Sequence, residues 1–263
     1  MTDHISSSNF SPTHFDTHQL NNDKFNDECG VFGVFATPEA STHTVLGLHA
    51  LQHRGQEAAG IVSQADGQFY SHKSLGHVAD NFNTKPVIES LPGDSAIGHV
   101  RYSTSGGTGL RNVQPLFADL ARGGFAVCHN GNLTNALTLK KQLVNKGAIF
   151  QSTSDSEVVI HLIATSTYPI LQDKFIDAMR RVEGAFAFVA LSQDCLIGAR
   201  DPLGVRPLVI GKLPHDGYIF ASETCALDII GADFIRDVEP GEVVTVTKEG
   251  MTSVKPFHLS NPR

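Results

Sequence analysis

The order in which two kinds of hydrophobic pattern follow each other along the chain most strongly constrains its fold. Short apolar, partly β-branched runs come in two consecutive groups, and a block of helical patterns separates them. Strands that follow one another without regularly alternating helices favour antiparallel sheets with helices packed on them, and they argue against a doubly wound parallel sheet. The sequence therefore predicts an α+β fold.

The expected elements follow from apolar spacing and from capping residues. The first group of strands is expected at 29–36, 59–64, 68–72, 94–102 and 124–129, with a helix at 41–52. The block of helices is expected at 134–146, then from Ser154 or Asp155 onward, and at 169–182, with Asn132 or Thr134 capping the first. The second group of strands is expected at 185–191, 195–199, 208–211, 218–221 and 242–247.

The composition changes abruptly at the start of the first expected strand. Residues 1–28 are rich in Ser, Asn, Asp and His and have no hydrophobic period, which is typical of a disordered segment. We expect them to be a leader that is disordered or removed by cleavage. Residues 29–255 are expected to form one domain, and residues 256–263 to begin a linker to a domain that the chain lacks.

Charge and cysteine usage exclude several classes of protein. The net charge is −7, and Lys and Arg are scattered rather than grouped, which argues against nucleic-acid and membrane-surface partners. No apolar run has the length of a membrane span. The four cysteines form no CxxC pair, the 13 histidines show no metal spacing, and the polar N-terminus is no secretion signal. A cytoplasmic protein with reduced thiols and no metal site is expected.

Cys29 is the candidate nucleophile, because it stands at the start of the folded part of the chain. A lone cysteine before a strand is more often a small core residue. However, removal of the leader would make Cys29 the first residue, and its own α-amine could then act as the base for its thiol. A free α-amine has a pKa of about 7.7–8.0, so a useful fraction is neutral near neutral pH.

Other polar clusters have an ordinary structural interpretation beside a functional one. Asn130-Gly131 is more often a tight turn than an oxyanion hole. Asp155 is more often a helix cap than a ligand site, and Arg101 alone is more often half of a surface ion pair. The Gly-rich loop at 105–109 lacks the Lys and Ser or Thr of a phosphate loop.

Taken together, these pieces resemble a known family, the class II glutamine amidotransferase domains, which are N-terminal-nucleophile hydrolases. The matching strings are, in order, CGVFGVF, LQHRGQEAAGI, GHVRYSTSG, CHNGNLTN, TSDSEV, ARDPLGVRPL and ASETCALD. The resemblance runs from residue 29 to about residue 250 and implies a four-layer αββα sandwich of two antiparallel sheets. LQHRGQEAAGI, RYSTSG and SETCALD favour the branch with a phosphoribosyltransferase as second domain over asparagine synthetase, glutamate synthase and glucosamine-6-phosphate synthase.

The resemblance also implies a role for each residue of the site. Cys29 would attack the side-chain amide of glutamine and form a thioester, with Asn130 and the backbone N–H of Gly131 as the oxyanion hole. Arg101 would pair with the α-carboxylate of glutamine and Asp155 with its α-ammonium, since opposite charges at the two ends of a pocket select a zwitterion. The backbone around Gly55 and Thr104 would line the pocket.

Cofactor and partner expectations follow from the same resemblance. Glutamine is the expected substrate, no cofactor or iron–sulfur cluster is expected in this chain, and Mg²⁺ is expected only for the missing phosphoribosyltransferase domain. The ammonia acceptor domain would be absent, and the full enzyme could be a homo-oligomer. Two alternatives stay open: the glutaminase domain of another class II amidotransferase, or an unprocessed, non-catalytic module.

Overall fold

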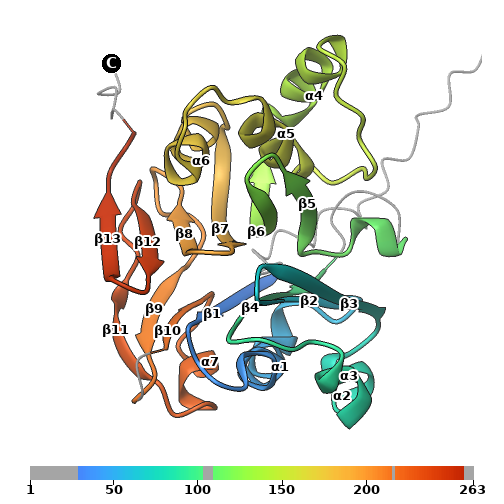
Figure 1. Ribbon diagram of the computed structural model, residues 1–263, viewed down its shortest axis with the longest axis vertical. Helices are drawn as coiled ribbons and strands as arrows, with labels where there is room; N and C mark the ends of the chain where they lie inside the picture. Colours follow the sequence, from blue (N-terminus) through green and yellow to red (C-terminus); the bar gives the residue numbers. More distant parts are fainter. Residues whose placement is uncertain (1–28, 103–108, 215–216, 258–263) are drawn as a thin grey trace, which may run out of the picture.

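The computed structural model describes residues 29–102, 109–214 and 217–257. Within these ranges the chain forms two antiparallel β-sheets that lie face to face, with one layer of helices on the outer face of each (Figure 1). The α+β sandwich of four layers predicted from the sequence is confirmed. The expected leader, residues 1–28, lies outside the described residues.

Each sheet combines an early run of consecutive strands with a later one. The seven-stranded sheet has the order β11-β9-β10-β1-β4-β2-β3, and the six-stranded sheet has the order β13-β12-β8-β7-β6-β5. The seven-stranded sheet contains β1 Gly30–Phe35, β2 Ala58–Ala65, β3 Gln68–Leu75, β4 Ser95–Arg101, β9 Val209–Lys212, β10 Tyr218–Ala221 and β11 Asp233–Asp237. The six-stranded sheet contains β5 Leu116–Leu120, β6 Gly123–Leu133, β7 Gly184–Ser192, β8 Leu196–Arg200, β12 Val243–Thr247 and β13 Gly250–Val254.

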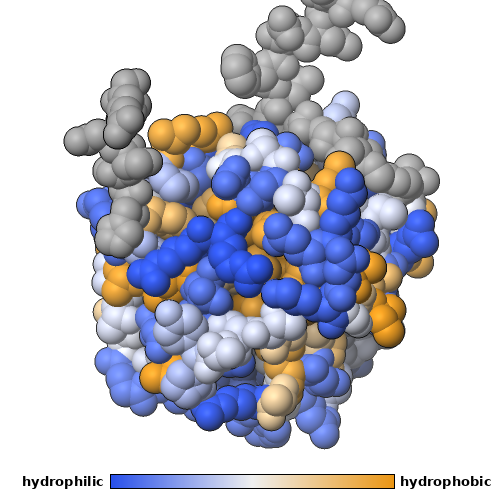
Figure 2. Space-filling view, turned by 90° about the horizontal axis from the view of Figure 1, so that it is seen from above, coloured by the Kyte–Doolittle hydropathy of each residue, from blue (hydrophilic) through white to orange (hydrophobic). Residues whose placement is uncertain are grey.

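The helices form the two outer layers. The seven-stranded sheet is covered by α1 Ala40–Ala50, α2 Val78–Asn81, α3 Lys85–Glu89 and α7 Cys225–Asp228, and the six-stranded sheet by α4 Ala136–Asn145, α5 Glu157–Thr165 and α6 Leu171–Met179 (Figure 1). Two short 3₁₀ helices, η2 Gln52–Arg54 and η3 Leu110–Asn112, lie between strands. Seen from the side of α4, α5 and α6, the surface is mostly hydrophilic, with apolar patches between (Figure 2). No helix among the described residues is long and apolar enough to cross a membrane.

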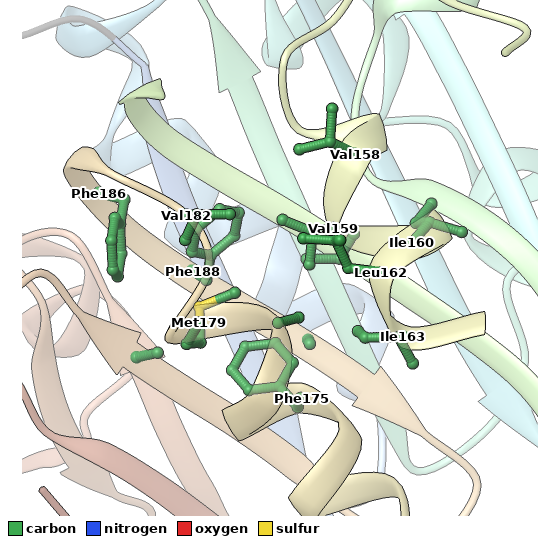
Figure 3. Close-up of a cluster of buried hydrophobic side chains, with 14 of the residues drawn as sticks. Val158, Val159, Ile160, Leu162, Ile163, Phe175, Met179, Val182, Phe186 and Phe188 are labelled. Atoms are coloured by element: carbon green, nitrogen blue, oxygen red, sulfur yellow. The ribbon is translucent and has the colours of Figure 1, made fainter. Parts of the chain in front are cut away.

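Buried apolar side chains fill the three spaces between the four layers. Phe175 of α6 and Phe188 of β7 belong to the cluster between the six-stranded sheet and its helices (Figure 3). Strand β1 contributes side chains to the other two clusters. Val31 packs in the cluster between the sheets, and Phe32 packs against α1 in the cluster between the seven-stranded sheet and its helices. Strands of such a sheet are buried on both faces, which explains why their sequences are almost continuously apolar rather than alternating.

Several boundaries differ from the sequence-based expectation. Strand β6 continues to Leu133 instead of ending at residue 129, so Asn130-Gly131 lies inside a strand and the tight-turn interpretation is wrong. Helix α4 begins after Asn135, not after Asn132 or Thr134, and helix α5 begins after Ser156. Neither helix has a side-chain cap, so the predicted capping by Ser154 or Asp155 is also wrong.

The two sheets approach each other closely at Gly33 of β1. A Cβ built on Gly33 would lie 2.6 Å from Cγ1 of Val189 and 3.1 Å from side-chain atoms of Ile97 and Leu196. We expect Gly33→Ala to lower the free energy of unfolding by about 1–3 kcal/mol, because the added methyl group overpacks the space between the sheets. Urea denaturation measures this change.

Gly109→Ala is the matched control for that substitution. Gly109 has φ −76°, which any residue adopts, and the nearest atom to an added Cβ is 3.8 Å away. Its unfolding midpoint is expected to stay at or slightly above that of the parent protein. Equal urea midpoints for Gly33→Ala and Gly109→Ala would show that the space between the sheets at Gly33 accommodates an added methyl group.

Candidate functional site

Cys29 lies directly before β1, where Arg54 contacts its backbone. Its backbone N–H donates to the carbonyl oxygen of Arg54 over 3.0 Å, and its own carbonyl accepts from Nε of Arg54 over 2.8 Å. Cys29 has φ 65°, a left-handed conformation that is uncommon for a residue with a side chain. Its Sγ lies 3.6 Å from the carbonyl oxygen of Tyr102. The candidate nucleophile is therefore held by its backbone, and its side chain is partly exposed.

Arg54, whose side chain holds the backbone of Cys29, is a buried cation. Arg54, the last residue of η2, is 1% exposed and is among the largest fully buried side chains. Its guanidinium forms an ion pair with Glu223, whose other carboxylate oxygen lies 3.0 Å from Nε2 of His53. Burial favours the neutral form of Glu223, but the hydrogen bonds and charges of Arg54 and His53 outweigh burial and hold the pKa of its carboxyl below the ordinary value.

A cavity opens beside Cys29 and brings most of the predicted site together. Four of the predicted residues line it, and they come from both sheets and from the loop before α5. Its walls are Cys29, His99, Arg101, Tyr102, Asn112, Gln114, His129, Gly131, Asn132, Ser154 and Asp155. The lining is mainly polar, as a site for a zwitterionic ligand requires.

Asn130 and Gly131 of β6 provide groups that are suited to an oxyanion. The side chain of Asn130 is fully buried, and neither its amide nitrogen nor its oxygen has a hydrogen-bond partner among the described residues. A buried polar group without a partner costs about 1–3 kcal/mol, so such groups commonly await a ligand. Gly131 has φ 141°, and a Cβ there would overlap the carbonyl oxygen of Ala185 on β7. Only glycine fits this position without moving the strand.

Two buried histidines lie behind these groups. Nε2 of His99 lies 3.2 Å from the carbonyl oxygen of His129, and burial lowers the pKa of His99 to about 3 despite that contact. His99 is therefore neutral across the physiological range. The ring of His129 stacks on Phe188 with centroids 4.3 Å apart, and its Nδ1 lies 3.0 Å from Oγ of Ser156. These contacts fix both rings and leave His129 facing the cavity.

Asp155 is held as a carboxylate at one end of the cavity. Its Oδ2 accepts from the N–H of Leu133 over 2.8 Å, and its Oδ1 lies 3.7 Å from Nδ1 of His129. Burial opposes ionisation, but His129, the Leu133 N–H and the Ser156 hydroxyl together bring the pKa of Asp155 to about 2. Arg101 lines the same cavity and is 8% exposed, so the surface-ion-pair interpretation of Arg101 is wrong.

The remaining two predicted residues lie differently. Gly55 follows η2, and a Cβ on it would lie 2.6 to 2.8 Å from backbone atoms of Val100 and Arg101. Glycine thus lets the end of η2 pack directly on the end of β4, although Gly55 is not among the cavity walls. Thr104 lies outside the described residues.

Sequence reasoning assigned no role to Arg54, His99, His129 or Glu223. All four stand inside the strings that carry the family resemblance, which is the signal that marks them. Their partners lie 25 to 170 positions away in the chain, so local patterns could not find them. Within the described ranges, no group of three or more His, Cys, Asp or Glu side chains is arranged to hold a metal ion.

The environments of the four cysteines predict an order of reactivity. Cys128 and Cys195 are buried, and burial raises the pKa of both thiols; burial and Glu223 also raise the pKa of the Cys225 thiol. We expect iodoacetamide to alkylate Cys29 first near neutral pH, as followed by peptide mass mapping. In denaturant all four should react at similar rates. Alkylation of Cys128 before Cys29 in the native protein would contradict the described burial.

Comparison with known proteins agrees with this geometry. Residues 99–228 match the family described as a glutamine amidotransferase domain. An amidophosphoribosyltransferase of Rhizobium etli is 54% identical over 93% of this chain and 49% of its own length. The chloroplastic amidophosphoribosyltransferase 3 of Arabidopsis thaliana is 47% identical over 96% of this chain and 47% of its own length.

Solved structures show the same relationship. The glutamine phosphoribosylpyrophosphate amidotransferase of B. subtilis, solved with ADP and GMP, superposes with a TM-score of 0.81 at 46% identity, over 87% of this chain and 49% of that chain. The chain therefore spans about half the length of the relatives it matches. It belongs to the glutamine amidotransferase family, as a class II domain of the amidophosphoribosyltransferase type.

Proposed function

We propose that this domain hydrolyses the side-chain amide of glutamine to glutamate and ammonia, with Cys29 as the nucleophile. The observation that carries the proposal is the cavity itself. It places the Cys29 thiol beside a polar pocket with Arg101, Gly131 and the Asp155 carboxylate in its walls. Asn130, the residue before Gly131, is not itself among these walls, but its amide is buried and has no hydrogen-bond partner among the described residues. A thiol, an oxyanion donor and two opposite charges together fit an amino acid with a carboxamide side chain.

The base in the proposed reaction is the α-amine of Cys29, which exists only after the bond to Glu28 is cut. The amine takes the thiol proton, and the thiolate attacks the amide carbon of glutamine. The tetrahedral intermediate then expels ammonia, which receives the proton held by the amine, and leaves a thioester on Cys29. Water attacks the thioester with the amine again as base, and glutamate leaves with the regenerated thiol.

The pocket residues supply charge stabilisation and selection in this proposal. The Asn130 side-chain amide and the N–H of Gly131 donate to the negative oxygen that forms in both tetrahedral intermediates. Asp155 pairs with the α-ammonium of glutamine, and its low pKa keeps the carboxylate charged for this purpose. Arg101 pairs with the α-carboxylate, for which a planar guanidinium fork is well shaped. Gly55 and Thr104 contribute backbone to the pocket wall.

The names of the relatives suggest where the ammonia goes. They name phosphoribosyl pyrophosphate and purine biosynthesis. With the family resemblance, we propose phosphoribosyl pyrophosphate as the acceptor and phosphoribosylamine as the product. That step would belong to a phosphoribosyltransferase domain, which would bring its own Mg²⁺, whereas we propose that the reaction of the half described here needs no cofactor. The full enzyme would work in the cytoplasm, where the thiol stays reduced, and would assemble as a homo-oligomer.

The nucleophile assignment predicts a dependence on the residue at the N-terminus. Protein that begins at Cys29 should convert glutamine to glutamate, measured by an enzymatic glutamate assay, while protein that retains Glu28 should be nearly inactive. Cys29→Ala in the shortened protein should abolish turnover because no thioester can form. The proposed function would be refuted if Cys29→Ala still turned over glutamine. It would also be refuted if the parent protein that begins at Cys29 produced no glutamate.

The oxyanion assignment predicts a large effect of one amide. Asn130→Ala should lower kcat about 10²- to 10³-fold, because one fixed donor to the oxyanion is lost. Asn81→Ala removes the same group from α2 in the outer helix layer, where its amide donates to Leu75 and His77, and serves as the control. A kcat for Asn130→Ala within about twofold of that for Asn81→Ala would exclude Asn130 from the oxyanion hole.

A further inference from the structure

Glu223 stands behind the nucleophile without touching the cavity. It follows β10, the strand next to β1, and its carboxylate contacts two side chains of η2, Arg54 and His53. The residue before it, Ser222, forms two hydrogen bonds with Val31 of β1. Its Oγ accepts from the N–H of Val31 over 2.9 Å, and its N–H donates to the carbonyl oxygen of Val31 over 3.0 Å. This segment is therefore fixed against the strand that carries Cys29.

The contacts form a continuous chain from Glu223 to the backbone of Cys29. Glu223 pairs with the guanidinium of Arg54, and Nε of Arg54 donates to the carbonyl of Cys29. The nitrogen of Cys29 donates in turn to the carbonyl of Arg54. A cation that is 1% exposed needs a counter-charge, since breaking a buried pair leaves an uncompensated charge. Glu223 supplies that charge to the guanidinium that holds the backbone of Cys29.

We propose that Glu223 is a positioning residue for glutamine hydrolysis: through Arg54 it orients the backbone of Cys29, and its charge favours proton uptake by the α-amine of Cys29. The inference rests on the proposed function, because it gives a role to an amine that exists only in the processed protein. Glu223 itself is not among the residues that line the cavity.

The sign of the charge effect follows from simple electrostatics. Arg54 is a cation beside the amine and disfavours a second positive charge there, whereas the carboxylate of Glu223 offsets Arg54. Replacing Glu223 by Gln removes the offset, so the protonated amine is less stable and the pKa of the amine falls. The reaction should then remain active at lower pH than in the parent protein.

The other charged groups around Cys29 stay in place when Glu223 changes. Arg101 of β4 and Asp155 of the loop before α5 carry charge in the cavity in front of the thiol, His129 of β6 lines the same cavity, and buried His99 is neutral. His53 of η2 loses the carboxylate of Glu223 but keeps the contact of its Nδ1 with the carbonyl oxygen of Ala50, and 57% of its side chain is exposed to solvent. A change in the pKa of the amine when Glu223 is replaced therefore reports how far the Glu223 carboxylate compensates the charge of Arg54.

The experiment titrates the α-amine directly. Protein beginning at Cys29 is labelled with ¹⁵N-cysteine, and the amine signal is followed by NMR across pH in the parent protein, Glu223→Gln and Glu223→Asp. We expect the pKa of the amine to fall by several tenths to about one unit in Glu223→Gln. Glu223→Asp keeps the charge but withdraws it by one methylene, so its shift should have the same sign and a smaller size. Where Glu223→Gln does not fold, Glu223→Asp decides alone.

Kinetics separate positioning from simple loss of structure. Glu223→Gln should lower kcat about 10- to 100-fold by misplacing the nucleophile, with KM for glutamine changed less than about twofold because the walls of the cavity are untouched. The acidic limb of its pH profile should move to lower pH. Glu89→Gln on α3 removes the same charge from an exposed pair with Lys85 and should leave amine titration and kinetics unchanged.

An amine that titrates at the parent pH in both Glu223 variants would overturn the inference, whatever their activity. Failure of the proposed function looks different, because the parent protein would then show a titrating amine and no glutamate. A shift in the amine of the predicted sign supports the role of Glu223 even in that case.

Discussion

The packing of the two sheets against each other sets the geometry of the whole site, because each sheet carries a different part of it. Cys29 directly precedes β1 and Arg101 ends β4, both of the seven-stranded sheet, whereas Asn130 and Gly131 belong to β6 of the six-stranded sheet. The distance between the proposed nucleophile and the proposed oxyanion donors is therefore set by the distance between the sheets. Close approach at Gly33, and the contact of His99 with the carbonyl of His129, hold that gap at a fixed width. Well-packed sheets cannot slide without losing this contact.

The site combines a buried polar side chain without a partner and an uncommon backbone conformation. The side chain of Asn130 has no partner among the described residues, and Cys29 has a left-handed backbone. Each costs about 1–3 kcal/mol, and such costs persist only where the surroundings over-determine them. The surroundings do so here, because β4 and β6 form walls of the cavity and the buried Arg54 holds the backbone of Cys29. The stability of the sandwich thus offsets the strain of the site.

The sequence predicted the layers well and the contacts between them poorly. Strands such as β10 were placed correctly because their apolar runs are buried on both faces. Strands β11 and β13 were missed because they are exposed edges with polar residues. Strand β6 was predicted too short, since Asn-Gly has a strong local preference for turns that pairing with β7 overrides. Site residues came from the family strings, but the link from Arg54 to Glu223 spans 169 positions and depends on the fold alone.

The environment of Cys29 also explains how a nucleophile that begins inside the chain could become N-terminal without refolding. In the described structure the nitrogen of Cys29 donates to the carbonyl of Arg54, and its carbonyl accepts from the side chain of Arg54. An amine donates through the same nitrogen, so cutting the bond to Glu28 would exchange one donor for another and keep the contact. What changes is the lone pair: an amide nitrogen has none to offer, and a neutral amine has one next to the thiol. On the proposed mechanism, cleavage would then supply the base and would leave the described walls of the pocket in place.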